Sequence, residues 1–169
     1  MILYHGSYIV IKKPDLSFSR FRTDFGKGFY VTPLKEQAFS WSQRFLRERG
    51  TAAISFYDFL PKQGDKLPPD KKILEFNSHS LEWLNFITTC RLGQPGPEQP
   101  NDTIDWDLII GGVANDKVFD TLQLYFDGLV GPEEAIGRLR YNKPNFQYCF
   151  KKQSLLDEYL NFTGSEVLK

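Results

Sequence analysis

The sequence has little histidine and little cysteine. Its 169 residues include 2 His and 2 Cys. Cys90 and Cys149 stand too far apart to form a zinc cluster, and two thiols make no disulfide framework in a chain of this length. Two histidines likewise argue against a His-rich metal centre. The sequence therefore predicts no metal site, and a protein of a reducing compartment, the cytoplasm.

An excess of charge of one sign is also missing. The chain has 21 Lys and Arg against 21 Asp and Glu, which gives a formal net charge of +0. A general nucleic-acid binder usually carries a basic excess, because neutralising phosphates supplies much of its affinity. The balance argues against bulk nucleic-acid affinity, although residues 12–27 are locally basic.

Long hydrophobic runs are absent as well. No apolar stretch approaches the ~18 residues that indicate a membrane span. The first residues lack the basic stretch and apolar run of a secretory signal. We therefore expect neither a membrane span nor a signal peptide.

Aromatic rings, by contrast, are abundant. Aromatic residues make up 15% of the chain, with 15 Phe, 8 Tyr and 3 Trp, and hydrophobic residues make up 41%. This composition suits a packed core, and a chain of this length favours one domain, here residues 1–169. We expect most rings to be core and some to serve as stacking surfaces.

The apolar pattern and turn signals predict strands and helices without a regular βαβ rhythm. The predicted strands cover residues 1–8, 29–32, 51–60, 72–76, 107–111 and 146–151, and the predicted helices 36–47, 81–91, 116–126 and 132–140. The C-terminal tail mixes a short helix with a last strand, and residues 12–28 and 93–102 are expected to be loops. This order favours an α+β fold over a doubly wound sheet.

Two helices carry clear end signals. Pro33 and Gly50 frame the first, which should place Ala38, Trp41 and Phe45 on one face. Ser80 is the expected cap of the second, whose inner face should hold Leu81, Leu84 and either Ile87 or Thr88. We expect His79, just before it, to be structural.

Three segments have the residue types of a ligand site. His5-Gly6-Ser7 ends the first strand, the pair Gly26 and Gly28 leads into Tyr30, and Gln147 is a polar residue among the aromatics of a late strand. Each signal is weak alone, because an early His, a Gly-x-Gly turn and a strand Gln all have ordinary structural explanations.

Together, and in this order, the segments resemble the ADP-ribosyltransferase superfamily, in the His-Tyr-Glu branch that includes poly(ADP-ribose) polymerases and diphtheria-type toxins. More narrowly, the chain resembles a family of small bacterial proteins within it. The motifs that carry this likeness are Tyr4-His5-Gly6-Ser7, Asp24 to Tyr30, Gln37-Ala38-Phe39-Ser40-Trp41 and Val113-Ala114-Asn115-Asp116. The resemblance implies a single-domain ADP-ribosyltransferase-like fold, with split antiparallel or mixed sheets and flanking helices around an NAD cleft.

The resemblance also implies roles for individual residues. His5 would bond a hydroxyl of the adenosine ribose, and Ser7 would add a nearby hydroxyl. Gly6 would offer its backbone N–H and C=O to the nicotinamide amide, a close approach that a side chain would hinder. Tyr30, delivered by the Gly28 turn, would stack on the nicotinamide.

Two further residues have open assignments. Trp41 falls where the polymerases place a second stacking aromatic, and its alternative place is the core. Arg20 or Arg22 would reach the pyrophosphate, since guanidinium binds phosphate oxygens well; the alternative is a solvated loop arginine. The segment Val113 to Asp116 either caps a helix or shapes the cleft and the acceptor site.

The chain departs from the family pattern at its late strand. Polymerases place a catalytic Glu there, and this chain has Gln147. An amide oxygen still accepts a hydrogen bond from the nicotinamide ribose, but it brings no negative charge to favour an oxocarbenium ion. Poly(ADP-ribose) synthesis is therefore not expected, while transfer of a single ADP-ribose and loss of catalysis both stay open.

The sequence thus predicts an NAD-dependent mono-ADP-ribosyltransferase with His5, Tyr30 and Gln147 as catalytic residues and NAD as its substrate, without a metal. The expected acceptor is a macromolecule, a protein or a nucleic acid: the neutral net charge favours a protein, and the basic residues 12–27 leave a nucleic acid open. The resemblance suggests a bacterial toxin with an antitoxin-like partner. The alternative is a non-catalytic module that binds NAD or ADP-ribose.

Overall fold

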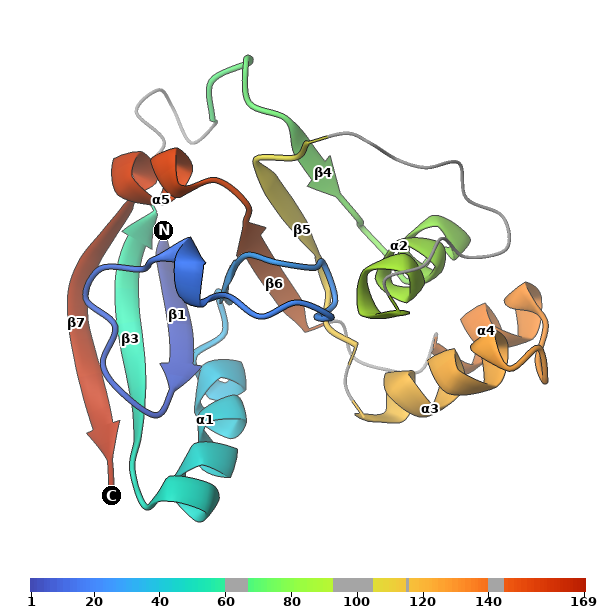
Figure 1. The fold of residues 1–169 in the computed structure, drawn as a ribbon, viewed down its shortest axis with the longest axis horizontal. Helices are drawn as coiled ribbons and strands as arrows, with labels where there is room; N and C mark the ends of the chain where they lie inside the picture. The colour runs from blue at the N-terminus through green and yellow to red at the C-terminus, as the bar shows by residue number, and fades with distance from the viewer. Residues whose placement is uncertain (60–66, 93–104, 115, 140–144) are drawn as a thin grey trace.

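The computed structural model is an α+β fold built on two β-sheets (Figure 1), as the sequence predicts. It describes residues 1–59, 67–92, 105–114, 116–139 and 145–169. The elements are β1 (Ile2–Ser7), a 3₁₀ turn η1 (Leu16–Phe18), β2 (Phe29–Val31), α1 (Lys35–Arg49), β3 (Ala52–Phe59), β4 (Ile73–Glu75), α2 (Leu81–Leu92), β5 (Leu108–Gly112), α3 (Asp116–Phe126), α4 (Pro132–Leu139), β6 (Phe146–Phe150), α5 (Gln153–Tyr159) and β7 (Leu160–Leu168).

The predicted strands and helices are confirmed, with small shifts at their ends. The predicted loop at residues 93–102 lies outside the described residues, as do Leu60, Asn115 and Arg140 at the edges of predicted elements. The end signals hold where they are described. Gly50 ends α1 with φ 71°, and the Ser80 hydroxyl accepts from the Trp83 N–H at 3.2 Å.

The first sheet has the strand order β1-β3-β7 and is antiparallel throughout. Helix α1 packs against β1 and β3. Its buried residues are Ala38, Ser42 and Phe45, whereas Trp41 is 52% exposed. The prediction that Trp41 shares the buried face is wrong, because the helix meets the sheet along its small residues and the large ring is left at the flank.

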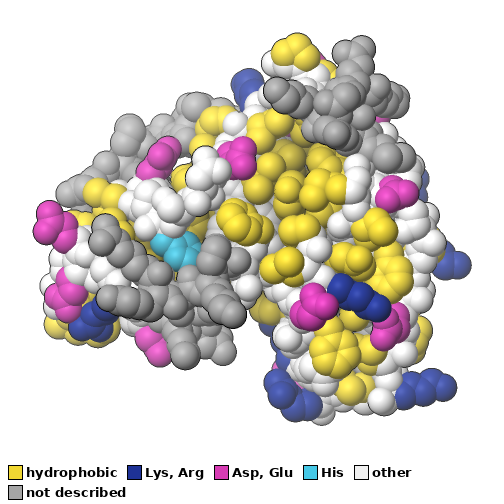
Figure 2. Space-filling view, turned by 180° about the vertical axis from the view of Figure 1, so that it is seen from behind, with side chains coloured by type: hydrophobic (Ala, Val, Ile, Leu, Met, Phe, Trp, Pro, Cys, Tyr) yellow, Lys and Arg dark blue, Asp and Glu magenta, His cyan; other side chains and the backbone are white. Residues whose placement is uncertain are grey.

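The second sheet has the order β2-β6-β5-β4, with β4 parallel to β5 and the other pairs antiparallel. Helices α2, α3 and α4 form a group beside it, on the other side of the molecule from α1 (Figure 1). A core cluster joins this sheet to the helices and includes Trp83, Leu84, Ile87, Ile109 and Leu122. Seen from behind, hydrophobic side chains also gather on the surface near the middle of the molecule (Figure 2). Within the described residues, no helix combines the length and apolar character needed to cross a membrane.

The two sheets share a hydrophobic core, and among the described residues one isolated bridge pairs their backbones. A single antiparallel bridge joins Tyr4 of β1 to Thr32, which directly follows β2. The Tyr4 N–H donates to the Thr32 carbonyl at 2.8 Å, and the Thr32 N–H donates back at 2.9 Å. The His5 and Tyr30 motifs lie next to this bridge, where the described backbone pairing between β1 and β2 ends and the His5 side chain contacts β2 instead.

Candidate functional site

His5 lies at the junction of the two sheets. Its Nδ1 is 2.6 Å from the carbonyl oxygen of Tyr30, and its ring stacks on Phe29 with centroids 4.5 Å apart. A carbonyl only accepts, so Nδ1 donates and the Nε2 of the neutral ring is left as an acceptor. Burial lowers the pKa of His5, an effect that its hydrogen bond to Tyr30 partly offsets. A neutral imidazole can therefore accept a hydrogen bond from a hydroxyl.

Gly6 presents an unpaired stretch of backbone. In an antiparallel pair, alternate residues direct both N–H and C=O to the same side. Tyr4 directs its groups at Thr32, away from β3, so Gly6, two residues further on, directs its own groups the same way. Neither is bonded to another described residue. They form a donor and acceptor pair at the edge of β1, the arrangement that a carboxamide requires.

The close packing of α1 against β1 also requires a glycine at position 6. A Cβ at this position would lie 2.3 Å from the carbonyl oxygen of Ala38. Gly28 is constrained in the same way, since its Cβ would lie 2.3 Å from the Sγ of Cys149 on β6. Both glycines of the motifs are therefore required by packing, independently of any ligand.

The Ser7 hydroxyl is committed to a local turn. It donates to the Ile9 carbonyl at 2.5 Å and accepts from the Ile9 N–H at 3.1 Å. These bonds fix the chain as it leaves β1 and leave the hydroxyl only its remaining acceptor capacity. Ser7 thus positions the strand end.

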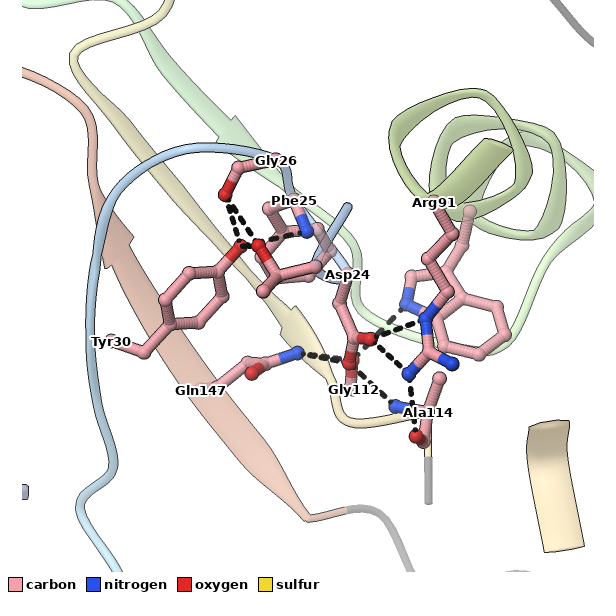
Figure 3. A network of polar contacts seen from close by, with 10 residues as sticks. Asp24, Phe25, Gly26, Tyr30, Arg91, Gly112, Ala114 and Gln147 are labelled. Carbon is pink, nitrogen blue, oxygen red and sulfur yellow. Dashed lines mark hydrogen bonds and ion pairs between the residues drawn. The ribbon is translucent and has the colours of Figure 1, made fainter. Parts of the chain in front are cut away.

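Tyr30 is held by the loop that precedes β2. Its hydroxyl donates to the Gly26 carbonyl at 2.6 Å, accepts from the Phe25 N–H at 2.9 Å and lies 2.8 Å from the Thr23 hydroxyl (Figure 3). Burial raises the pKa of Tyr30 well above its usual value. The ring lies roughly parallel to that of Phe25, with centroids 6.5 Å apart. Tyr30 is therefore a fixed, neutral ring, suited to stacking and not to proton transfer.

Gln147 is buried on β6, on the same face of the sheet as Tyr30. Tyr30 pairs with Cys149, and Gln147 is two residues before it, so all three side chains lie on one face. The Nε2 of Gln147 donates to the Asp24 carboxylate at 2.8 Å and to the Gly112 carbonyl at 3.3 Å. Both partners only accept, which settles the orientation of the amide.

This orientation leaves the amide oxygen of Gln147 free. No hydrogen bond from a described residue reaches Oε1, which points away from Asp24 in Figure 3. The negative charge of Asp24 polarises the amide and makes Oε1 a stronger acceptor. The site thus presents a fixed hydrogen-bond acceptor on β6.

Asp24 is the centre of a buried polar network that the sequence does not reveal. Its Oδ1 accepts from the Nε of Arg91 at 2.9 Å, and its Oδ2 accepts from the Ala114 N–H at 2.9 Å as well as from Gln147. Arg91 also donates to the Ala114 carbonyl at 3.0 Å. Asp24 stands inside a quoted motif, but nothing in the sequence indicates that Arg91, on α2, is its partner.

The Val113 to Asp116 motif takes part in this network through Ala114, whose backbone bonds both Asp24 and Arg91. Asn115 lies outside the described residues. A second motif residue, Gln37 on α1, donates through Nε2 to the Phe146 carbonyl at 3.3 Å, next to Gln147. The four motifs therefore meet around β1, β2 and β6.

Arg20 and Trp41 lie on the surface. Arg20 is exposed in the loop between β1 and β2. The Trp41 ring is stacked under Arg44, whose guanidinium carbon lies 3.5 Å from the ring centroid. His79 contacts Trp83 and lies beneath Gly112, away from His5. Within the described residues, no group of three or more His, Cys, Asp or Glu side chains is placed to hold a metal ion.

Comparison with known proteins gives a family without a described activity. No curated protein and no solved structure matches the chain. A family model described as "Protein of unknown function (DUF3990)" matches residues 1–162, nearly the whole chain. The chain therefore belongs to the DUF3990 family.

Proposed function

We propose that this protein is an NAD-dependent mono-ADP-ribosyltransferase that transfers ADP-ribose to a macromolecular acceptor and releases nicotinamide. One observation carries the proposal. His5, Gly6, Tyr30 and Gln147 come from opposite ends of the sequence, and they lie on neighbouring strands, since β1 is bridged to the end of β2 and β2 pairs with β6.

The groups at this place fit the parts of NAD. The N–H and C=O of Gly6 match the carboxamide of nicotinamide, and the Tyr30 ring is available to stack on the flat pyridine. The Nε2 of neutral His5 accepts from a ribose hydroxyl. Arg20 supplies a cation for the pyrophosphate, and Trp41, already stacked under Arg44, marks the flank of the site.

Gln147 is the residue that acts on the nicotinamide ribose. Its Oε1, oriented and polarised by Asp24, accepts from a ribose hydroxyl and fixes the sugar for cleavage of the bond to nicotinamide. Arg91 neutralises Asp24, so the site offers a dipole and not a net negative charge to the oxocarbenium-like transition state. We therefore expect slow transfer of single ADP-ribose units and no polymer.

The alternative function is a non-catalytic module of a single domain that binds NAD or ADP-ribose. The neutral amide at Gln147 and its compensated neighbour Asp24 favour it, because neither supplies charge to the reaction. Both functions belong to a cytoplasmic protein, and an antitoxin-like partner is part of the first proposal only.

The test uses purified protein with NAD labelled in the adenosine moiety, alone and with cell lysate. We expect nicotinamide release and label transfer that are lost in His5→Ala and Gln147→Ala. Gln123→Ala is the matched control, since Gln123 lies on α3 and bonds Asp127. Saturable NAD binding without turnover would support the binding module, and no binding would overturn both proposals.

A further inference from the structure

The loop between β1 and β2 is locally basic. Residues 8–28 hold the exposed cations Lys12, Lys13, Arg20, Arg22 and Lys27, none of which is ion-paired to a described residue. The loop holds two acids, fewer than its five cations. Asp24 is buried against Arg91, and Asp15 accepts from the Ser17 N–H at 2.8 Å. A chain with no net charge thus carries a basic surface here.

The same loop exposes two aromatic rings. Phe18 is 86% exposed and Phe21 is 74% exposed, the two highest values among the exposed large hydrophobic residues of the described chain. The Nζ of Lys27 lies 5.4 Å from the centroid of the Phe21 ring. Phenylalanine at the tip of a polar loop costs solubility, so these rings require an explanation other than core packing.

The loop folds as one surface with the flank of α1. Lys13 and Lys27 both act on Asp15, whose pKa is lowered first by the hydrogen bonds from Ser17 and then by these cations. Burial lowers the pKa of the Arg44 guanidinium, and the charge of Arg20 lowers it further. Arg44 in turn stacks on the half-exposed Trp41. We call this surface the basic aromatic loop: residues 12–27 with Trp41 and Arg44. Two cations in it contact rings, Lys27 on Phe21 and Arg44 on Trp41.

The basic aromatic loop adjoins the candidate site at both ends. It leaves β1 directly after His5-Gly6-Ser7 and enters β2 directly before Tyr30. In Figure 1 it crosses the front of the molecule from the first sheet to the second. A long ligand held on this surface would therefore reach the strand ends that hold His5 and Tyr30.

We propose that the basic aromatic loop is a docking surface for single-stranded nucleic acid, the class of acceptor that the neighbouring site would modify. The acceptor role rests on the proposed function, and the docking surface does not. Unpaired cations suit a phosphate backbone, and exposed rings suit unstacked bases. An acidic protein would satisfy the cations and leave the rings without a partner, and a duplex keeps its bases stacked inside.

Two sets of variants separate charge from stacking. Lys12→Ala/Lys27→Ala removes two cations, and Phe18→Ala/Phe21→Ala removes the rings. A separate variant, Arg22→Asn, removes one more cation. The backbone tolerates it, because Arg22 has φ 59°, a conformation that Asn adopts readily. The control Lys72→Ala/Lys169→Ala removes the same charge from exposed lysines outside the loop.

The experiment measures fluorescence anisotropy of a labelled mixed-sequence RNA oligonucleotide without NAD, over a range of salt concentrations. The matched DNA strand, the DNA duplex and a polyglutamate peptide are the comparison ligands. We expect the single strands to bind most tightly. The charge variant should lower the slope of log K against log salt by about 1.4, and the ring variant should weaken binding by ~10-fold or more at an unchanged slope.

Three outcomes would overturn the proposal: no binding of single strands at low salt, equal losses in the control variant, or tighter binding of the duplex or the peptide. Nicotinamide release without any nucleic acid is the separate measure of the proposed function. A protein that binds the strands and releases no nicotinamide upholds the docking surface and contradicts the transferase.

Discussion

The buried network around Asp24 and the basic aromatic loop share one stretch of chain, but among the described residues charges are paired in the network and unpaired in the loop. Asp24 has its oxygens bonded to Arg91, Ala114 and Gln147, and it lies 7% exposed. Arg22 and Lys27, two and three residues away, are exposed and unpaired within the described chain. A buried charge must be paired to persist, whereas an exposed one is solvated and remains available to a partner. The network therefore supports the fold and the loop is free to bind.

The largest effect should come from removing the centre of the network. Asp24→Ala leaves Arg91 without its carboxylate and the Ala114 N–H and Gln147 amide without their acceptor. We expect a loss of about 3–5 kcal/mol in the free energy of unfolding, measured with urea. Asp15→Ala, in the exposed part of the same loop, is the control and should cost far less stability than Asp24→Ala. Equal losses would show that burial does not distinguish the two acids.

A smaller effect should follow from placing a glutamate at position 147. Gln147→Glu brings a second carboxylate to within reach of Asp24, and the like charges raise the pKa of the pair. The variant should be less stable than the parent by about 1–3 kcal/mol at neutral pH. It should regain stability as the pH falls and one carboxyl binds a proton.

In the double variant Asp24→Asn/Gln147→Glu, the amide stands at position 24 and the carboxylate at position 147. The amide can again donate to the carboxylate, in the opposite direction to the parent protein. The double variant should recover part of the lost stability and, with a carboxylate now on β6, raise nicotinamide release above that of Gln147→Glu. Additive losses in the double variant would contradict the contact as the source of the effect.

The pH dependence of stability should reveal the buried histidine. Burial lowers the pKa of His5 in the folded protein, so the unfolded chain binds the proton more readily. The folded protein is therefore fully stable with respect to His5 above about pH 6.5, the pKa of histidine in the unfolded chain. It loses stability as the pH falls from there toward the lower pKa of His5 in the folded protein. His5→Gln should reduce the difference in melting temperature between pH 5 and pH 7.5. Part of the difference in melting temperature should remain in this variant, because burial also lowers the pKa of His79.

The smallest stability effect should come from the basic aromatic loop. Lys12→Ala/Lys27→Ala removes solvated charges without described partners, so the free energy of unfolding should change by no more than ~0.5 kcal/mol in a urea titration. A large loss in the free energy of unfolding would show that these lysines support the fold. It would contradict the distinction between a structural network and a loop free to bind.

Periodicity and turn residues were sufficient to predict most of the fold, because these signals act locally. The helices α1 and α2 end or begin at Gly50 and Ser80 through bonds within one turn. The exposure of Trp41 was not predictable in this way. It depends on the contact between Gly6 and Ala38, which joins a strand to a helix that the helical pattern alone cannot place.

The candidate site was predictable in part. Its strand residues His5, Tyr30 and Gln147 are found in neighbouring strands, as the motif order suggested. The partners that orient them were not foreseen, because they come from distant segments: Arg91 on α2 and Gly112 at the end of β5. Net charge likewise concealed the basic aromatic loop, since a total over the whole chain says nothing about its distribution.

The most direct test of the transferase is the rate at which nicotinamide is released from NAD by the parent protein, by His5→Ala and by Gln123→Ala. The account predicts measurable release that His5→Ala abolishes and Gln123→Ala leaves unchanged. Absence of release from a folded parent protein that still binds NAD, or equal release from all three, would contradict it.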